Sequence, residues 1–153
     1  MDDVIQLGIL YVKEGNYPEG FRLLKDAMGK YQHKKPEEIP AELQSYYGLC
    51  AAVLNKDLRG GLEHCRAALK RDFFQPDLHL NLGKLYLLAD QKSSAVHIFF
   101  KGLRLDDGHK GILAELQKLG IRKTPIIGFL PRGHFLNRIL GQIRYRMKSS
   151  RMS

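Results

Sequence analysis

The sequence predicts an all-α protein built from antiparallel helical hairpins, and three observations support this fold class. Residues 5–28, 45–69 and 80–103 align with one another as imperfect copies. Small residues recur at nearly constant positions within the copies, and turn-forming residues interrupt the helical spacing of the apolar residues in each. We therefore expect three hairpins, each made of two helices that approach closely.

Small residues mark the places where the two helices of each hairpin would touch. In the first copy Gly8 is followed by Gly20 twelve residues later and by Ala27 seven residues after that. The other copies keep this order, with one extra turn residue in the second: Gly48, Gly61 and Ala68, then Gly83, Ala95 and Gly102. Large apolar residues flank these positions on the same helical face, which is the pattern of a closely packed helix pair.

Turn signals place the helices of the hairpins in chain order. The stretch EGNYPEG separates the two helices of the first hairpin, and ADQKS separates those of the third. Pro18, Pro40 and Pro76 fall where the first turn of a helix tolerates a missing amide donor. The glycines that open the first and second copies are 40 residues apart, against 35 for the second and third. We therefore expect the second helix of the first hairpin to run long and to be followed by a wider loop.

Residues 109–120 continue the apolar pattern for one more helix after the third hairpin. Gln117 stands where the small residue of a close contact would be. A terminal helix in a repeat array must cover the core on one side and meet water on the other, so this polar residue predicts a solubilising cap. The domain organisation we expect is three hairpins with a capping helix over residues 1–120, followed by a separate segment over residues 121–153.

The repeated pattern resembles that of the tetratricopeptide repeat (TPR) family, whose signature joins a Leu-Gly pair, a Tyr three residues after the Gly, and an Ala-x3-Phe pair. The matching residues are Leu7-Gly8 with Tyr11, Leu82-Gly83 with Tyr86, and Ala95 with Phe99. The departures are the absence of Trp and the residues Ala51, Cys65 and Asp107, which replace a Tyr, an aromatic residue and a Pro. The resemblance covers residues 1–109 and implies an α-solenoid, a right-handed superhelix of hairpins whose concave face holds protein or peptide partners.

The resemblance also implies where a partner would bind, because ligands of this family lie along the first helices of the hairpins. Projected onto that side, the sequence gives nine candidate groove residues: Ile5, Ile9, Val12, Leu49, Ala52, Leu80, Asn81, Lys84 and Leu87. Most are apolar, which favours an amphipathic helix or an extended apolar segment as the partner. The alternative is that many of these side chains pack against the neighbouring hairpin, since apolar helical stripes are more often core than binding site.

One subgroup of the family grips the C-terminal carboxylate of its partner with Lys, Asn and Arg side chains on the first helices. The matching positions in this sequence are Ile5, Ile9, Tyr46, Asp77 and Asn81. Only Asn81 fits, so the sequence does not favour binding of the C-terminal tail of a chaperone through its carboxylate.

The chain changes character after Gly120. Residues 121–153 carry eight basic residues and no acidic one, whereas the whole chain has 25 basic and 16 acidic residues. Residues 121–135 contain two Pro and two Gly, which predicts an extended linker. Residues 134–148 regain a helical pattern with one apolar face: Phe135, Leu136, Ile139, Leu140, Ile143 and Met147. The basic residues lie outside that face or at its edge: Arg138, Arg144, Arg146 and Lys148.

Three roles are open for this basic amphipathic C-terminal helix. It can dock on the chain's own repeats or on a second copy, which would bury its apolar face. It can lie on an anionic membrane surface, where basic flanks and an apolar stripe are the expected features. It can also bind a nucleic acid or an acidic protein, although phosphate binding requires only cations. We favour docking on protein, because an amphipathic stripe usually meets protein.

The composition indicates where in the cell the protein is located and what role its two cysteines have. The first residues are acidic and no apolar run approaches the ~20 residues that span a bilayer, so we expect a cytoplasmic protein. Cys50 and Cys65 are too few for a disulfide framework or a zinc site of four cysteines. Both fall on apolar helical faces, which predicts small core residues.

Motifs for catalysis are not found in the sequence, which lacks a Gly-rich phosphate loop, a nucleophile elbow and a metal-binding His pair on one helix. The histidines are scattered, and we expect each on a helix surface or in a linker: His33, His64, His79, His97, His109 and His134. We therefore predict a non-enzymatic module without metal or cofactor that binds a protein or peptide. The competing hypothesis is a peripheral adaptor whose tail attaches to a membrane surface or a nucleic acid.

Overall fold

The computed structural model describes residues 2–121, and within this range it contains seven α-helices and one short 3-10 helix. Its contacts divide the chain into two units, Met1–Leu113 and Ala114–Ser153, and the second unit is described only as far as Ile121. The first unit holds six complete helices and the start of the seventh: α1 (Asp3–Lys13), α2 (Tyr17–Gly29), α3 (Ala41–Asn55), α4 (Leu58–Arg71), α5 (Pro76–Leu88), α6 (Lys92–Leu105) and α7 (Lys110–Lys118). The remainder of α7 belongs to the second unit.

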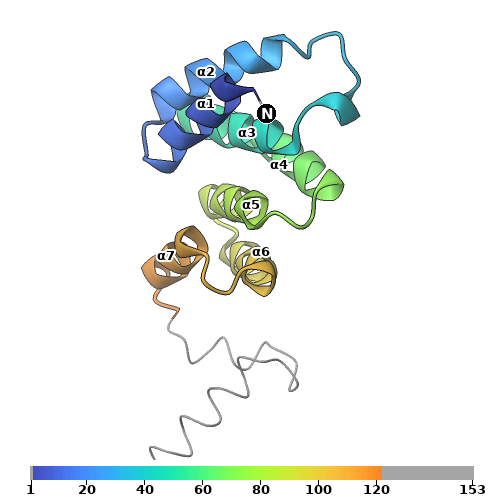
Figure 1. Ribbon diagram of the computed structural model, residues 1–153. Coiled ribbons are helices and arrows are strands. Elements are labelled where there is room, and N and C mark those ends of the chain that lie inside the picture. The colour runs from blue at the N-terminus through green and yellow to red at the C-terminus, as the bar shows by residue number, and fades with distance from the viewer. Residues whose placement is uncertain (1, 122–153) are drawn as a thin grey trace, which may run out of the picture. The chain divides into compact units, whose positions relative to one another are not determined.

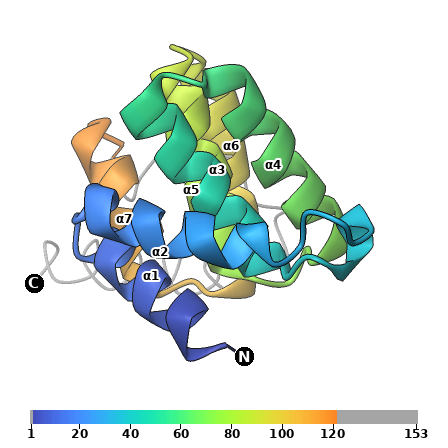
Figure 2. The same cartoon turned by 90° about the horizontal axis from the view of Figure 1, so that it is seen from above.

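Six helices of the first unit form consecutive hairpins, α1 with α2, α3 with α4, and α5 with α6 (Figure 1). Successive hairpins join where α2 packs on α3 and where α4 packs on α5. The first helices of the hairpins also contact one another in sequence, α1 with α3 and α3 with α5. Figure 2 shows the same helices from above. The prediction of an all-α fold of antiparallel hairpins is thus confirmed.

Glycines lie where the two helices of a hairpin meet, as their spacing predicted. A Cβ atom on Gly20 would lie 2.5 Å from Val12 Cγ2 and 2.9 Å from the backbone oxygen of Gly8. A Cβ atom on Gly61 would lie 2.7 Å from the backbone oxygen of Gly48. Such distances are shorter than close packing of carbon atoms allows, so α1–α2 and α3–α4 approach at a spacing that requires glycine at these points.

The core of the first unit is formed by large apolar side chains from both helices of each hairpin, among them Leu24, Leu78 and Phe99, which are 0% exposed. Cys50 and Cys65 are also 0% exposed, which confirms the prediction that they are small core residues. Burial raises the pKa of both thiols to about 12. Neither thiol is therefore a nucleophile at neutral pH.

The three hairpin turns share one backbone feature despite their different sequences. Each contains a residue with a left-handed backbone: Gly15 at φ 86°, Lys56 at φ 60° and Asp90 at φ 56°. The side chains of Asn16 and Asp57 then cap α2 and α4 by accepting a backbone N–H from the first helical turn. Only the first of the three turns has a glycine at the left-handed position, so the packing of the hairpins imposes this conformation on Lys56 and Asp90.

The second helix of the first hairpin is not lengthened, so that expectation was wrong. α2 has 13 residues, whereas α4 and α6 have 14 each. The extra residues before α3 form turns and a 3-10 helix, Pro36–Glu38. Arg71 at the end of α4 holds this segment, because its guanidinium donates hydrogen bonds to the backbone oxygens of Pro36 at 2.7 Å and Ile39 at 2.6 Å.

His79 contradicts the expectation that every histidine lies on a helix surface or in a linker. It is 0% exposed on α5, with its Nδ1 3.1 Å from the backbone oxygen of Gln75 and its ring edge-on to Phe73 at 4.9 Å. Burial lowers the pKa of His79. The expectation failed because the imidazole satisfies one nitrogen at Gln75, which precedes its helix, and packs its ring on Phe73, although its buried Nε2 has no hydrogen-bond partner among the described residues.

The described part of the second unit is the end of α7 and the residues that follow to Ile121. Gln117 is exposed, as the predicted cap requires, and Lys118 forms an ion pair of 3.0 Å with Glu115. Gly120, at φ 71°, follows the end of the helix. Across residues 2–121 no helix has the length and apolar character needed to cross a membrane.

Candidate functional site

A cavity of about 510 Å³ lies in the first unit, on the side of the first helices of the hairpins. α1, α3 and α5 contribute side chains to it, together with the segment that joins α6 to α7. We call this cavity the α5 pocket, and its lining residues are Val12, Lys13, Tyr46, Asp77, Leu80, Asn81, Lys84, Asp106, Gly108, His109, Lys110 and Gly111.

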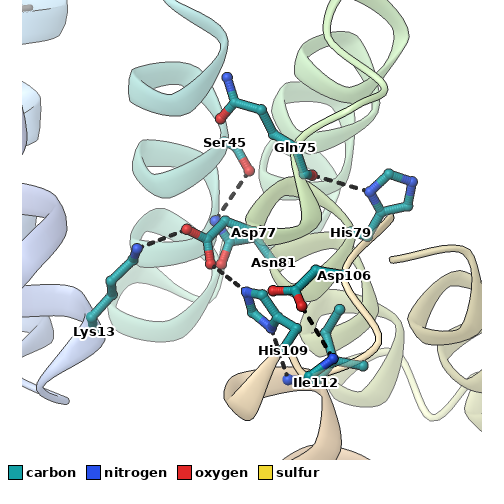
Figure 3. A network of polar contacts seen from close by, with 10 residues as sticks. Lys13, Ser45, Gln75, Asp77, His79, Asn81, Asp106, His109 and Ile112 are labelled. Carbon is teal, nitrogen blue, oxygen red and sulfur yellow. Dashed lines mark hydrogen bonds and ion pairs between the residues drawn. The ribbon is translucent and has the colours of Figure 1, made fainter. Parts of the chain in front are cut away.

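Asp77 in the first turn of α5 is the centre of the polar contacts in the α5 pocket (Figure 3). Its Oδ2 lies 2.7 Å from Lys13 Nζ of α1, and its Oδ1 lies 3.0 Å from His109 Nε2. Burial opposes ionisation of the carboxyl, but the hydrogen bonds and charge of Lys13 with the bond from His109 outweigh it, so the pKa of Asp77 is lowered. Asp77 is therefore ionised, and it connects α5 to α1 and to the segment between α6 and α7.

His109 both caps α7 and orients Asp77. Its Nδ1 accepts the backbone N–H of Ile112 at 3.2 Å, in the first turn of α7. In the neutral imidazole the other nitrogen then carries the hydrogen, so Nε2 donates to Asp77. The two bonds fix the ring from both sides (Figure 3). The segment between α6 and α7 is thereby held against α5 as one wall of the pocket.

Asn81 lies one helical turn beyond Asp77 and is 1% exposed. Its Nδ2 donates to Ser45 Oγ of α3 at 3.2 Å, and the Cys65 thiol donates to the backbone oxygen of Ser45 at 3.2 Å. Ser45 is itself 0% exposed. This buried set of contacts joins α3, α4 and α5 and fixes the floor of the α5 pocket.

Tyr46 of α3 brings a hydroxyl to the pocket, close to Asp77 and Asn81, that forms no hydrogen bond of normal geometry in the described part of the chain. The residue is 2% exposed. Burial, and after it the negative charge of Asp77, raises the pKa of the hydroxyl, which therefore stays protonated and can donate. A buried polar group without a partner costs about 1–3 kcal/mol, so the hydroxyl is a position where a ligand acceptor would be favourable.

Only part of the candidate groove predicted from the sequence lines the α5 pocket. Four of the nine residues do so: Val12, Leu80, Asn81 and Lys84. Four others are buried in the core at 1–5% exposure: Ile5, Ile9, Leu49 and Ala52. The last, Leu87, is half-buried and does not line the pocket. The burial of the second group is what the alternative of packing between hairpins requires, and their role in binding stays a prediction.

The α5 pocket is more polar than the sequence suggested, because the apolar residues of the first helices are used in packing between hairpins. In the sequence, Tyr46 and Asp77 are only mismatches to a carboxylate-binding site, and Lys13, Asp106, His109 and Lys110 are not among the predicted site residues. Lys13 follows Ile9 by four residues and so lies on the same helical side, which is a signal that the sequence contained. No such signal exists for His109, which is 32 residues from Asp77.

The residues of the predicted C-terminal helix lie outside the described residues. This applies to its apolar face, from Phe135 to Met147, and to its basic residues, from Arg138 to Lys148. Their docking on protein, on a membrane surface or on nucleic acid stays a prediction from the sequence. Within residues 2–121, no group of three or more His, Cys, Asp or Glu side chains is arranged to hold a metal ion.

No protein-family model matches the chain, and no curated protein matches it significantly. Solved structures do match. One is YrrB, described as a TPR protein with an unusual peptide-binding site, with a TM-score of 0.54 and 20% identity over 74% of this chain. The match spans 55% of the YrrB chain.

Two further structures are similar to this chain. The first TPR domain of human RPAP3 matches with a TM-score of 0.58 and 15% identity, over 83% of this chain and 94% of that domain. MamA matches with a TM-score of 0.55 and 15% identity, over 95% of this chain and 79% of MamA. At these identities the similarity concerns the fold, so the chain has a TPR-like fold of sequential helical hairpins, as its repeats predicted.

Proposed function

We propose that this chain is a non-catalytic TPR-like module that binds an extended polar segment of a partner protein at the α5 pocket. The fold supports this proposal, because TPR-like arrays typically hold protein or peptide partners. YrrB, one of the structures with the same fold, is described as having a peptide-binding site. The α5 pocket is more polar than the apolar groove expected from the sequence. The proposed partner is therefore a polar segment and not an apolar one.

The observation that carries the proposal is the Tyr46 hydroxyl. It lines the α5 pocket, is buried, and forms no hydrogen bond of normal geometry in the described chain, although the Asp77 carboxylate is close enough to raise its pKa. A backbone carbonyl of a bound peptide would supply an acceptor and remove the cost of the unpaired hydroxyl.

The remaining walls suit an extended peptide rather than a small apolar ligand. Lys84 and Lys110 add positive charge to the lining of the pocket, and Asp77 and Asp106 add negative charge. Leu80 gives an apolar contact at 8% exposure. A peptide with a carbonyl at Tyr46, an apolar side chain at Leu80 and polar side chains elsewhere would complement all of these groups.

Selection from a library of random displayed peptides against the full chain tests the proposal. Peptides that bind the wild-type protein should bind Tyr46→Phe about 10-fold more weakly, since one hydrogen bond is worth about 1 kcal/mol or slightly more. The same substitution should leave thermal stability unchanged or raise it, because it removes a buried polar group without a partner.

Tyr47→Phe is the matched control. It removes a hydroxyl from the next residue of α3, whose ring packs on Phe21 of α2 at 5.5 Å and does not line the pocket. Binding should be unaffected. The proposal is wrong if Tyr46→Phe and Leu80→Ala bind the selected peptides as tightly as the wild type does, or if no peptide prefers the wild type to Leu80→Glu.

A further inference from the structure

The outward face of α1 carries an exposed apolar stripe that neither the core nor the α5 pocket uses. Val4, Leu7 and Leu10 are 36%, 45% and 50% exposed. At 100° per residue Leu7 and Leu10 lie opposite the buried face of α1, which contains Ile5 and Val12, and Val4 lies at the edge of that face. Apolar residues spaced three apart on one helical face form a continuous strip suited to a second helix.

The repeats show what normally covers this face. The residues equivalent to Val4, Leu7 and Leu10, counted from the glycine of each repeat, are Gln44, Tyr47 and Cys50 in α3 and His79, Leu82 and Leu85 in α5. All six are buried except Tyr47, which is half-buried.

The covering element in the later repeats is the second helix of the preceding hairpin or the segment next to it. α2 packs on α3, where the Phe21 ring lies 5.5 Å from the ring of Tyr47. α4 packs on α5, where Phe73 of the connecting segment covers His79. The face of α1 that corresponds to the covered faces of α3 and α5 is therefore suited to pack against a helix. No helix among residues 2–121 occupies it.

The unpaired charges on this side of α1 are acidic, because the bases near it, Lys13 and Arg22, form ion pairs. Asp3 and Glu14 lie on the same side of α1 as Leu7 and are exposed, and neither forms an ion pair with another described residue. The nearest base in the helix is Lys13, three residues after Leu10, and it is paired with Asp77 of α5. The face thus has an apolar centre with one carboxylate near each end, although the whole chain has a net charge of +9.

We propose that the outward face of α1 binds an amphipathic helix of a partner protein that carries Lys or Arg at both ends of its apolar stripe. Asp3 and Glu14 are 11 residues apart, or about 16 Å along the helix, so the basic residues of the partner must have a similar separation of about three turns. Binding buries the three exposed side chains and pairs both carboxylates. This surface is separate from the α5 pocket and does not depend on the function proposed for it.

A designed helical peptide of Leu and Lys, with its lysines about three turns apart, is the probe, and its Leu/Glu counterpart is the comparison peptide. Binding to the full chain is measured by fluorescence anisotropy at low salt. The Leu/Lys peptide should bind, and Leu7→Glu with Leu10→Glu should weaken it by about 10-fold or more. Leu88→Glu is the matched control, because Leu88 is an equally exposed leucine of α5 at 54% and should have no effect.

Charge exchange tests the role of the carboxylates. Asp3→Lys with Glu14→Lys should weaken the Leu/Lys peptide and strengthen the Leu/Glu peptide, each by several-fold. Since all four substituted residues are exposed, the helical circular dichroism should be unchanged, which separates lost binding from lost folding.

Three outcomes overturn the proposal. The first is equal binding of the Leu/Lys peptide to wild type, Leu7→Glu with Leu10→Glu, and Leu88→Glu. The second is a wild-type protein that self-associates in sedimentation equilibrium and becomes monomeric with Leu7→Glu, since a second copy is then the occupant. The third is about 10-fold tighter peptide binding after Ile139→Glu with Ile143→Glu, since the chain's own C-terminal segment then competes for the face.

Discussion

Helices α1 and α5 hold the same place in the first and third repeats, yet α5 is covered on a face where α1 meets solvent. Leu7 is 45% exposed, whereas its counterpart Leu82 is 3% exposed, and Leu10 is 50% exposed against 0% for Leu85. The residues are identical, so the difference arises from the neighbours. α5 lies between α4 and α6, whereas α1 packs with α2 and α3. The position in a repeat sets the direction of a side chain, and the adjacent hairpin decides whether it is buried.

The same comparison applies to the polar residues of the two helices. α5 places Asp77 and Asn81 in ordered contacts with other elements, whereas α1 contributes one pocket side chain with a charge, Lys13. The bond between Lys13 and Asp77 is the ion pair that links the two helices. A helix inside the array can therefore form a site with fixed geometry, while a helix with an open face retains a surface for a further helix.

Alanine substitution of the equivalent leucines Leu85 and Leu10 should give the largest difference in the free energy of unfolding. Leu85→Ala should lower the free energy of unfolding by about 2–5 kcal/mol, because it leaves a cavity in a closed core. Leu10→Ala should change it by less than about 0.5 kcal/mol, because the side chain is half exposed. Urea denaturation followed by circular dichroism measures both. Equal losses would mean that the α1 face is covered in solution.

Alanine substitution of the equivalent glycines Gly83 and Gly8 should give a smaller difference in the free energy of unfolding. A Cβ atom on Gly83 would overlap the Phe99 ring, so Gly83→Ala should destabilise the protein by about 1–3 kcal/mol. On Gly8 it would lie 3.0 Å from Leu24 Cδ2 and Cγ and 3.3 Å from Leu23 Cβ, which is milder crowding, and the higher helix propensity of Ala, about 1 kcal/mol, opposes it. Gly8→Ala should therefore be close to neutral in the same urea assay. A neutral Gly83→Ala would show that Phe99 repacks freely.

The buried imidazole of α5 should make stability depend on pH. Burial holds the pKa of His79 below its value in the unfolded chain, about 6.5, so the unfolded state binds the proton more readily. The contribution is fully present above about pH 6.5 and is lost as the pH falls below it. His79→Gln should reduce the loss of stability between about pH 7 and pH 5.

Val4→His is the control for this pH dependence. It places an imidazole at the equivalent position of α1, where the side chain is 36% exposed, so burial opposes its ionisation much less than that of His79. Thermal melts across the same pH range should then match those of the wild type. If His79→Gln and wild type lose stability in parallel on acidification, the burial of His79 does not control this part of the pH profile.

The reactivity of cysteine thiols should distinguish the exposed face of α1 from the equivalent buried face of α3. This test has the smallest expected effect on stability. Cys50 occupies the position in α3 that is equivalent to Leu10, and burial raises its pKa to about 12. An exposed thiol has a pKa near 8.5, so Leu10→Cys should react with a disulfide reagent about 10³-fold faster than the native cysteines at pH 8. The wild-type protein should react only after unfolding. Rapid reaction of the folded wild type would show that α3 opens readily.

The repeated spacing of small residues was enough to predict the hairpins, because close helix contacts require small side chains wherever they occur. Gly20 and Gly61 lie at such contacts in the structure. The exception was the length of α2, where extra residues could extend a helix or form a loop. Arg71 favours the loop by binding its backbone oxygens from α4. That contact joins residues more than 30 positions apart, and local sequence carries no sign of it.

By itself, the sequence determined the class of the fold, the order of its hairpins, the close contacts at the glycines and the burial of both cysteines, because these follow from residue size and helical period. Only the tertiary structure decided which apolar residues of the first helices are core, that His79 is buried, and that Lys13 and His109 meet at Asp77. The physical reason is that burial and polar pairing depend on which distant elements become neighbours. Helical period fixes the direction of a side chain and leaves open what it meets.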